Sequence, residues 1–199
     1  MNIVFRLLEI AFISMMADNI VLTRSIGMST ALMVAKKRSR LGGFGICITY
    51  MTTITGIISY FFLRYLPVGD YKPLCTPMIF SAVLAAVYVL TLILLRRFRY
   101  DTFDGLKKYV HISAFNCAVF GILYLSVQQC TTPADFAVFG LFSGLGFMAA
   151  AFMTAIVYDK LYSEDVPLFF RGYPALLIYN GILAMACYGL TGHQLAYTI

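Results

Sequence analysis

The sequence predicts an all-α polytopic membrane protein with six transmembrane helices. Of its 199 residues, 61% are apolar and 12% are charged, and the mean hydropathy is +0.83, whereas soluble domains carry about 25% charged residues. The apolar residues form stretches near the length of about 20 residues that a helix needs to cross a hydrocarbon core of about 30 Å. Lys and Arg lie mostly between these stretches. We therefore expect one integral membrane domain covering residues 1–199.

The six predicted spans are residues 3–33, 41–63, 74–95, 110–127, 136–158 and 173–190. The first is 31 residues long and contains Asp18, Asn19, Arg24 and Gly27, so we expect it to be broken or strongly tilted. Non-helical backbone survives at membrane depth only where protein or a cavity covers it. The break should therefore be buried in protein. No small-residue cleavage pattern follows a basic start, so we do not expect a removable signal peptide.

The fourth and fifth spans carry internal interruptions of two kinds. In the fourth, Asn116, Cys117 and Gly121 break an apolar run, so we expect this helix to be broken as well. In the fifth, three glycines provide a small-residue surface of the kind that allows close helix packing, at Gly140, Gly144 and Gly146.

Basic residues predict the orientation of the six spans. Loops one, three and five together carry eleven Lys and Arg, whereas loops two and four carry only Arg64 and Lys72. Because cytoplasmic loops carry the excess of Lys and Arg, both termini should face outward from a bacterial-type inner membrane. No basic stretch is interleaved with stacking aromatic residues, so the net charge of +6 does not indicate nucleic-acid binding.

Three spans precede loop three and three follow it, so two equal halves would enter the membrane from opposite sides. This arrangement is an inverted repeat, with a first repeat at about residues 1–100 and a second at about 101–199. Asn19 and Gly27 in the first half correspond to Asn116 and Gly121 in the second.

Five cysteines are present without a C-x-x-C spacing, and the two histidines complete no zinc or haem motif. Cys47 and Cys187 are expected to be small apolar fillers. Cys75 and Cys130 lie at the outward ends of spans three and four, either as a disulfide or as two unpaired thiols. Cys117 is either part of a functional site, because polar groups in lipid tend to mark such sites, or part of a packing surface.

Charged residues inside the first span should be compensated, because each costs about 2.5–3.5 kcal/mol near the bilayer centre on insertion scales. Asp18 is either a cation or proton ligand or the partner of Arg24 or of a neighbouring helix. Arg6 and Glu9 are three residues apart and are expected to form a local pair. The sequence contains no phosphate-binding loop and no catalytic triad, so the chain is not expected to be catalytic alone.

Three segments together resemble one family. They are residues 18–22 (Asp-Asn-Ile-Val-Leu) with Gly27, residues 116–121 (Asn-Cys-Ala-Val-Phe-Gly), and residues 165–172, which include Asp165, Pro167, Phe170, Arg171 and Gly172. In order and spacing, over nearly the whole chain, they resemble the Rnf A subunit and the related E subunit of the Na⁺-translocating NADH:quinone oxidoreductase. The third segment is the most specific of the three.

The resemblance implies a membrane subunit of an ion-translocating electron-transport complex that works beside a homologous six-helix sister subunit and other subunits. It also implies a 2Fe-2S cluster that is shared with the sister and carries electrons across the bilayer, and to which each subunit contributes two cysteines. Cys117 matches one of these ligands, but Ser29 occupies the position of the other, and a hydroxyl is a far poorer iron ligand than a thiolate. The alternative is a redox-inactive paralogue that acts as a scaffold or a small transporter.

Overall fold

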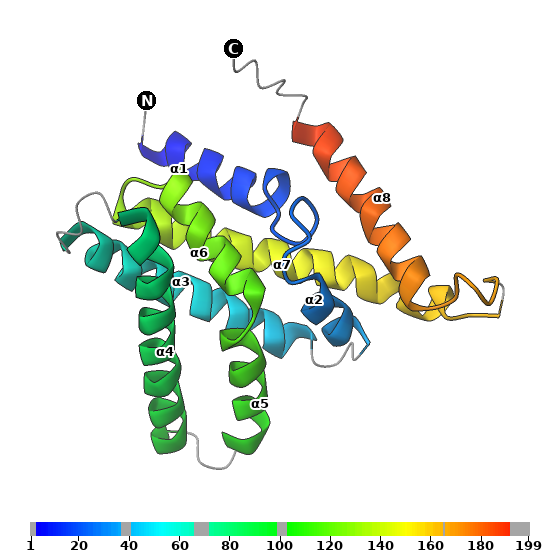
Figure 1. Cartoon of the computed structure of the whole chain (residues 1–199), viewed down its shortest axis with the longest axis horizontal. Helices are drawn as coiled ribbons and strands as arrows, with labels where there is room; N and C mark the ends of the chain where they lie inside the picture. The colour runs from blue at the N-terminus through cyan, green and yellow to red at the C-terminus, as the bar shows by residue number, and fades with distance from the viewer. Residues whose placement is uncertain (1–2, 37–40, 66–71, 99–102, 165, 192–199) are drawn as a thin grey trace.

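Every regular element is a helix in the computed structural model, which describes residues 3–36, 41–65, 72–98, 103–164 and 166–191 (Figure 1). The α-helices are α1 (Ile3–Phe12), α2 (Met28–Ala35), α3 (Leu41–Tyr65), α4 (Lys72–Phe98), α5 (Phe103–Ala114), α6 (Cys117–Gln129), α7 (Pro133–Leu161) and α8 (Tyr173–Thr191). A single turn of π-helix, η1 (Ile13–Ala17), continues α1.

The first apolar stretch is broken between η1 and α2, as predicted. The π-type turn closes where the Asp18 N–H donates to the carbonyl of Ile13 at 2.7 Å. Residues 18–27 then form no regular element. Gly27, with φ +82°, directly precedes the first residue of α2. Ile20, Val21 and Leu22 in this segment are buried. The centre of the break is therefore covered by protein, as the absence of water at membrane depth requires, whereas Arg24 and Ser25 are exposed.

The predicted fourth span is also broken, between α5 and α6, which are bent by 49°. Asn116 separates them in an extended conformation, with φ −97° and ψ 131°. Its side-chain oxygen accepts from the N–H of Ala118 at 3.1 Å, which caps the new helix. The polar residue inside the apolar run thus ends one helix and begins the next.

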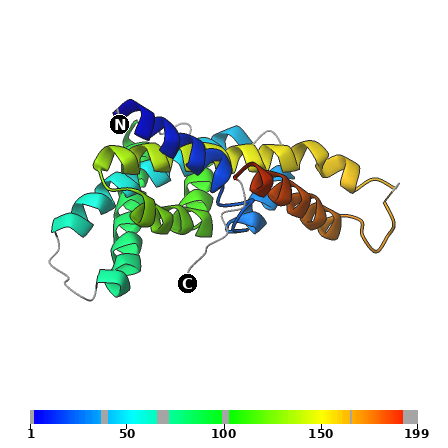
Figure 2. The same ribbon diagram turned by 90° about the horizontal axis from the view of Figure 1, so that it is seen from above.

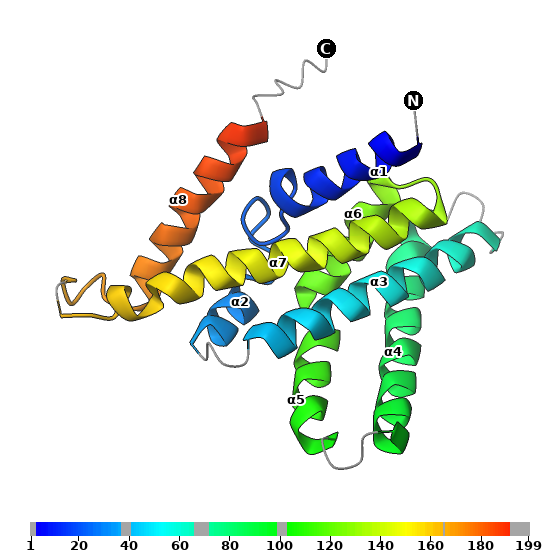
Figure 3. The ribbon, with the colours of Figure 1, turned by 180° about the vertical axis from the view of Figure 1, so that it is seen from behind.

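Helices α3 and α7 form the centre of the fold and run side by side in both Figure 1 and Figure 3. Glycines on α7 bring the two backbones close: a methyl group added at Gly144 would lie 2.6 Å from Cα of Thr49, and one at Gly140 would lie 3.0 Å from the carbonyl oxygen of Thr52. The Thr52 hydroxyl donates to the Gly140 carbonyl at 2.9 Å. This confirms the predicted packing role of the α7 glycines.

The start of α7 is determined locally. Thr132 caps the helix, Pro133 occupies its first turn, and Asp135 completes the capping box with Thr132. Seen from above, α7 crosses most of the length of the molecule (Figure 2). It is therefore positioned to contact α1, η1, α2, α3, α6 and α8.

The prediction of six spans is met in part. Among the described residues, α3, α4 and α7 are long and apolar enough to cross a membrane, and the bent pair α5 and α6 counts as a fourth span if taken together. Helix α8 is apolar but shorter, and the first stretch is divided. Large apolar side chains remain exposed on α4 and α8, among them Met78, Ile93, Ile182 and Met185. Such surfaces are expected to contact lipid or other subunits.

Candidate functional site at the two helix breaks

Asn19 holds the first break together. It is buried, and its side-chain amide donates to the carbonyls of Met15 at 3.1 Å and Gly146 at 2.9 Å. Its side-chain oxygen accepts from the N–H groups of Val21 at 3.1 Å and Leu22 at 3.4 Å. One side chain thus satisfies backbone groups that the break frees and ties the segment to α7.

Asn116 has a corresponding role at the second break. Both Asn19 and Asn116 use the side-chain oxygen to accept from a backbone N–H two residues later. The Thr30 hydroxyl of α2 also donates to the Asn116 oxygen at 3.4 Å. The buried Nδ2 of Asn116 has no hydrogen-bond partner among the described residues. Asn116 therefore links the N-terminal ends of α2 and α6.

The two breaks pack into each other through their glycines. A methyl group at Gly27 would lie 2.6 Å from Cβ of Ala118 in α6. A methyl group at Gly121 would lie 3.0 Å from Cδ1 of Ile20 in the first break. Each glycine thus makes room for a residue of the other segment. The two segments that the sequence pairs as counterparts are therefore also in contact.

Ser29 and Cys117 line one cavity of about 600 Å³ beside these breaks. They are 88 residues apart in the sequence, and both side chains are exposed. The cavity is also lined by residues 22 and 25–28 and, from α8, by Tyr173, Leu177, Asn180, Gly181 and Ala184. The structure therefore brings together the two positions that the family resemblance identified.

Asn180 is a cavity residue that the sequence interpretation missed. It is fully buried, accepts from the Thr154 hydroxyl at 2.8 Å, and donates to the Leu176 carbonyl at 2.9 Å. An amide within the sixth apolar stretch is the signal that would have identified it. Its hydrogen bond to α7 fixes the face that α8 presents to the cavity.

The described residues do not by themselves fit an iron–sulfur cluster. Cys117 is the one thiol that lines the cavity, whereas such clusters are usually held by four cysteine thiolates. Nowhere in the described part of the chain do three His, Cys, Asp or Glu side chains gather as metal ligands. Cys47 packs against the apolar cluster around Met51 and Val83, as expected of an apolar filler, and does not line this cavity. Three further ligands would have to come from elsewhere.

Asp18 is a partner of Arg24, one of the two predicted alternatives. The Nε of Arg24 donates to one carboxylate oxygen of Asp18 at 3.1 Å. The side-chain amide of Gln129, at the end of α6, donates to the other oxygen at 2.6 Å. The Asp18 charge is thus compensated by Arg24, and each carboxylate oxygen accepts one hydrogen bond.

The predicted pair between Arg6 and Glu9 is wrong. The Arg6 guanidinium lies 2.7 Å from the carboxylate of Asp135 and also donates to the Thr131 hydroxyl, while Glu9 is exposed. Asp135 is 2% exposed at the start of α7, so it gains more from a countercharge than an exposed carboxylate does. The sequence offers one signal for the position of Asp135: it lies three residues after Thr132, which is the spacing of a capping box at the start of a helix.

Cys75 and Cys130 are free thiols, as are the other three cysteines. Cys130 lies in the connection between α6 and α7 and is buried. Burial, with the nearby Asp135 carboxylate, raises the pKa of the Cys130 thiol to about 12. This thiol is therefore protonated at neutral pH.

The third family segment forms a compact turn between α7 and α8. The carbonyl of Pro167 accepts from the N–H groups of Phe170 and Arg171, both at 2.9 Å. The Arg171 side chain donates to the carbonyls of Glu164 at 3.0 Å and Val166 at 3.3 Å. Gly172, with φ +86°, leads into α8. Asp165 lies outside the described residues.

The positions of these turn residues indicate a structural role. Gly172 donates its N–H to the carbonyl of Leu161 at 3.1 Å, which closes the connection onto the end of α7. Tyr173 follows directly and lines the cavity with Cys117. The turn thus sets where α8 begins beside the cavity.

Comparison with known proteins places these features in a family. A family model described as "Rnf-Nqr subunit, membrane protein" matches residues 7–194. The chain is 26% identical over 179 residues to the A subunit of the ion-translocating oxidoreductase complex of Shewanella sediminis and 27% identical over 179 residues to that of Tolumonas auensis, with 90% of this chain and 93% of each relative covered. The corresponding protein of Histophilus somni is 26% identical over 175 residues, covering 88% of this chain and 91% of the relative. The chain therefore belongs to the Rnf-Nqr subunit family of membrane proteins.

Proposed function

We propose that this chain is a membrane subunit of an ion-translocating electron-transport complex of the Rnf type. The support comes from relatives named as the A subunit of an ion-translocating oxidoreductase complex, which match the chain over about nine-tenths of its length. The long apolar helices and the exposed apolar faces of α4 and α8 fit a subunit that is surrounded by lipid and other subunits. Other subunits would bind the electron donor and acceptor.

Within that complex, Cys117 would be one ligand of a 2Fe-2S cluster shared with a homologous six-helix sister subunit. The observation that carries this proposal is that Ser29 and Cys117 are both exposed at the cavity beside the two interlocked breaks. An exposed thiol at the surface is available to a ligand set completed by a neighbouring chain. When bound, such a cluster would supply one-electron transfer. Asn19 and Asn116 would hold the breaks in the geometry that presents Cys117.

Ser29 favours a second candidate, a redox-inactive scaffold or small transporter. A homodimer would supply only two Cys117 thiols and two Ser29 hydroxyls, and a hydroxyl is a poor ligand for iron. At the first break the Asp18 carboxylate is paired with Arg24 and Gln129, so a transported cation would compete there with the Arg24 guanidinium.

The membrane arrangement completes the proposal. The ends of α2, α3 and α5 that adjoin the basic loops one and three would face the cytoplasm, with both termini outward. The two halves, residues 1–100 and 101–199, would be related as inverted repeats. Their support is the matching use of Asn19 and Asn116 and the reciprocal packing of Gly27 and Gly121.

The test is the iron and acid-labile sulfide content, with an electron paramagnetic resonance spectrum, of the complex purified anaerobically from its native membrane. We expect stoichiometric iron that is lost in Cys117→Ala and kept in Cys187→Ala, a matched control on α8. Ser29→Cys is expected to retain the iron and shift the spectrum. An intact complex whose iron content is unchanged by Cys117→Ala, or that holds no iron, would leave the scaffold or transporter as the function.

A further inference from the structure

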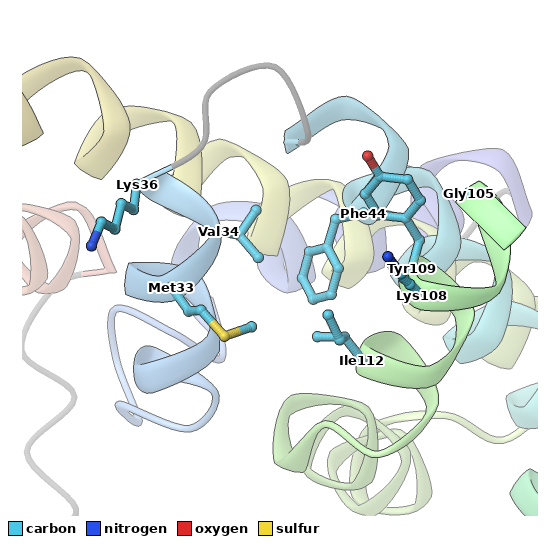
Figure 4. Close-up of a pocket in the computed structure, with 8 residues that line it drawn as sticks. All are labelled: Met33, Val34, Lys36, Phe44, Gly105, Lys108, Tyr109 and Ile112. Atoms are coloured by element: carbon cyan, nitrogen blue, oxygen red, sulfur yellow. The ribbon is translucent and has the colours of Figure 1, made fainter.

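A second cavity, of about 440 Å³, lies where the end of α2 and the starts of α3 and α5 meet (Figure 4). Its lining residues are Met33, Val34, Lys36, Phe44, Gly105, Lys108, Tyr109 and Ile112. None of them lines the cavity that contains Cys117. Its volume is in the range of small-molecule sites, about 300–1,000 Å³.

The interior of this cavity is apolar. Phe44 and Val34 are buried beneath it, while Met33 and Ile112 are partly exposed at its opening. In Figure 4, Met33 on α2 and Ile112 on α5 extend from opposite sides toward the space in front of Phe44. The α3 backbone supports one wall, because a methyl group at Gly43 would lie 3.7 Å from the Tyr109 ring. Such an interior suits a hydrocarbon chain.

The rim of the cavity is positively charged. Lys36 and Lys108 are exposed on opposite sides, and neither forms an ion pair with another described residue. Among the residues that the structure describes, none of those lining the cavity is acidic. In Figure 4 the Lys36 side chain extends away from Phe44 and Lys108, so its flexible stem has to turn for the amine to meet a headgroup at the rim. The sequence adds Lys37, Arg38 and Arg40 directly after Lys36.

The cavity also lies at an end of the membrane domain. The end of α2 and the starts of α3 and α5 adjoin loops one and three, which carry nine of the fifteen Lys and Arg residues. Long basic side chains at helix ends place their stems along apolar surface and their charges at the headgroup level. Basic pockets between helices on this side of a membrane recognise anionic lipid headgroups.

We propose that this cavity binds an anionic phospholipid of the surrounding bilayer, with part of one acyl chain against Phe44 and the phosphate between Lys36 and Lys108. A zwitterionic lipid fits less well because its ammonium group would face the same two lysines. Each lysine near an anionic headgroup is expected to raise the affinity by about five-fold. This proposal does not depend on whether Cys117 binds iron.

The absence of tryptophan from the chain allows a direct test. Tyr109→Trp places the single tryptophan, which is excited selectively over the tyrosines, in the cavity. Tyr124→Trp places it at an exposed position of α6 that does not line the cavity. Each full-length variant is reconstituted in phosphatidylcholine vesicles that contain increasing amounts of brominated phosphatidylglycerol or brominated phosphatidylcholine. Quenching then reports which lipid contacts the tryptophan.

We expect the tryptophan at 109 to be half-quenched at a mole fraction of phosphatidylglycerol about five-fold lower, or more, than that of phosphatidylcholine. The tryptophan at 124 should show little preference. Lys36→Gln or Lys108→Gln should each lower the preference severalfold, while Lys160→Gln, an exposed lysine at the end of α7, should leave it unchanged.

Equal quenching at position 109 by the two lipids would mean ordinary contact with the bilayer and would overturn the proposal. Absence of quenching by either lipid would mean that lipid does not enter the cavity, with the same consequence. Ile112→Trp replaces Tyr109→Trp if the latter does not elute as a single folded species.

Discussion

Gly27→Ala tests the interlocking of the two breaks. Gly27 has a φ of +82°, and a residue with a Cβ in this left-handed region costs roughly 1–2 kcal/mol. The new Cβ would also lie 2.6 Å from Cβ of Ala118 and 3.1 Å from the Phe147 ring. Because the Ala118 methyl is fixed to the α6 backbone, it cannot rotate away, and overpacking of this kind costs roughly 1–3 kcal/mol.

The two effects together should lower the free energy of unfolding by roughly 2–5 kcal/mol. At about 2–4 °C per kcal/mol for a chain of this size, the melting temperature should fall by several degrees at least. The melting temperature is measured by monitoring the thermal unfolding of the purified chain in detergent with circular dichroism. Gly181→Ala in α8 is the matched control, since a methyl group there meets nothing within 4 Å.

The steric contribution can be separated with Ala118→Gly, which removes the group that Gly27→Ala would strike. In the double variant, roughly 1–3 kcal/mol of the loss should be recovered beyond the sum of the single effects. Two results would refute the reasoning: a melting temperature of Gly27→Ala equal to that of Gly181→Ala, or no coupling between positions 27 and 118.

Three further predictions concern the helix contacts and the buried thiol. Gly144→Ala should destabilise the chain by roughly 1–3 kcal/mol, because the added methyl group would lie 2.6 Å from Cα of Thr49. Gly42→Ala is the control, since the space around Gly42 is open. Equal melting temperatures for the two variants would contradict the close packing of α3 and α7. Arg6→Met should cost roughly 1–2 kcal/mol, discounted because the Arg6 side chain is 39% exposed. Asp135→Asn also weakens the cap of α7, but it should cost less in the Arg6→Met background than in the parent chain, and equal costs in the two backgrounds would argue against the ion pair. Since the pKa of Cys130 is raised from 9.0 to about 12, a chain with Cys130 as its sole cysteine should react with a maleimide at pH 8 about 10³-fold more slowly than an ordinary thiol does. The reaction rate should rise about ten-fold per pH unit, and mass spectrometry of the labelled chain measures it. A rate equal to that of a chain retaining only the exposed Cys117 would disprove the prediction.

The two breaks were predictable from sequence because their signals are local. Asn19, Gly27 and Asn116 are polar or flexible residues inside apolar runs, and each acts on backbone groups within a few residues of itself. The glycines of α7 were predictable for the same reason, since the absence of a side chain is already evident in the sequence. In these cases the chemistry of a residue and its neighbours in the chain were sufficient.

Partners from distant parts of the chain were not predictable. Arg6 was assigned to Glu9, three residues away, but it pairs with Asp135, 129 residues away. Asn180 received no role because its partner Thr154 belongs to a different helix. A periodic pattern shows which face of a helix is polar, but not which helix packs against that face.

The sequence by itself determined that the chain belongs in a membrane, where its apolar stretches lie, and where two of them break. These properties follow from the transfer of each segment from water to lipid and from local hydrogen bonding, both of which depend on neighbouring residues. Only the tertiary structure decided that the two breaks interlock, that Ser29 and Cys117 share one cavity, and that Lys36 and Lys108 flank another. These features depend on how helices far apart in the chain pack, and packing is decided by the shapes of whole surfaces rather than by any one segment.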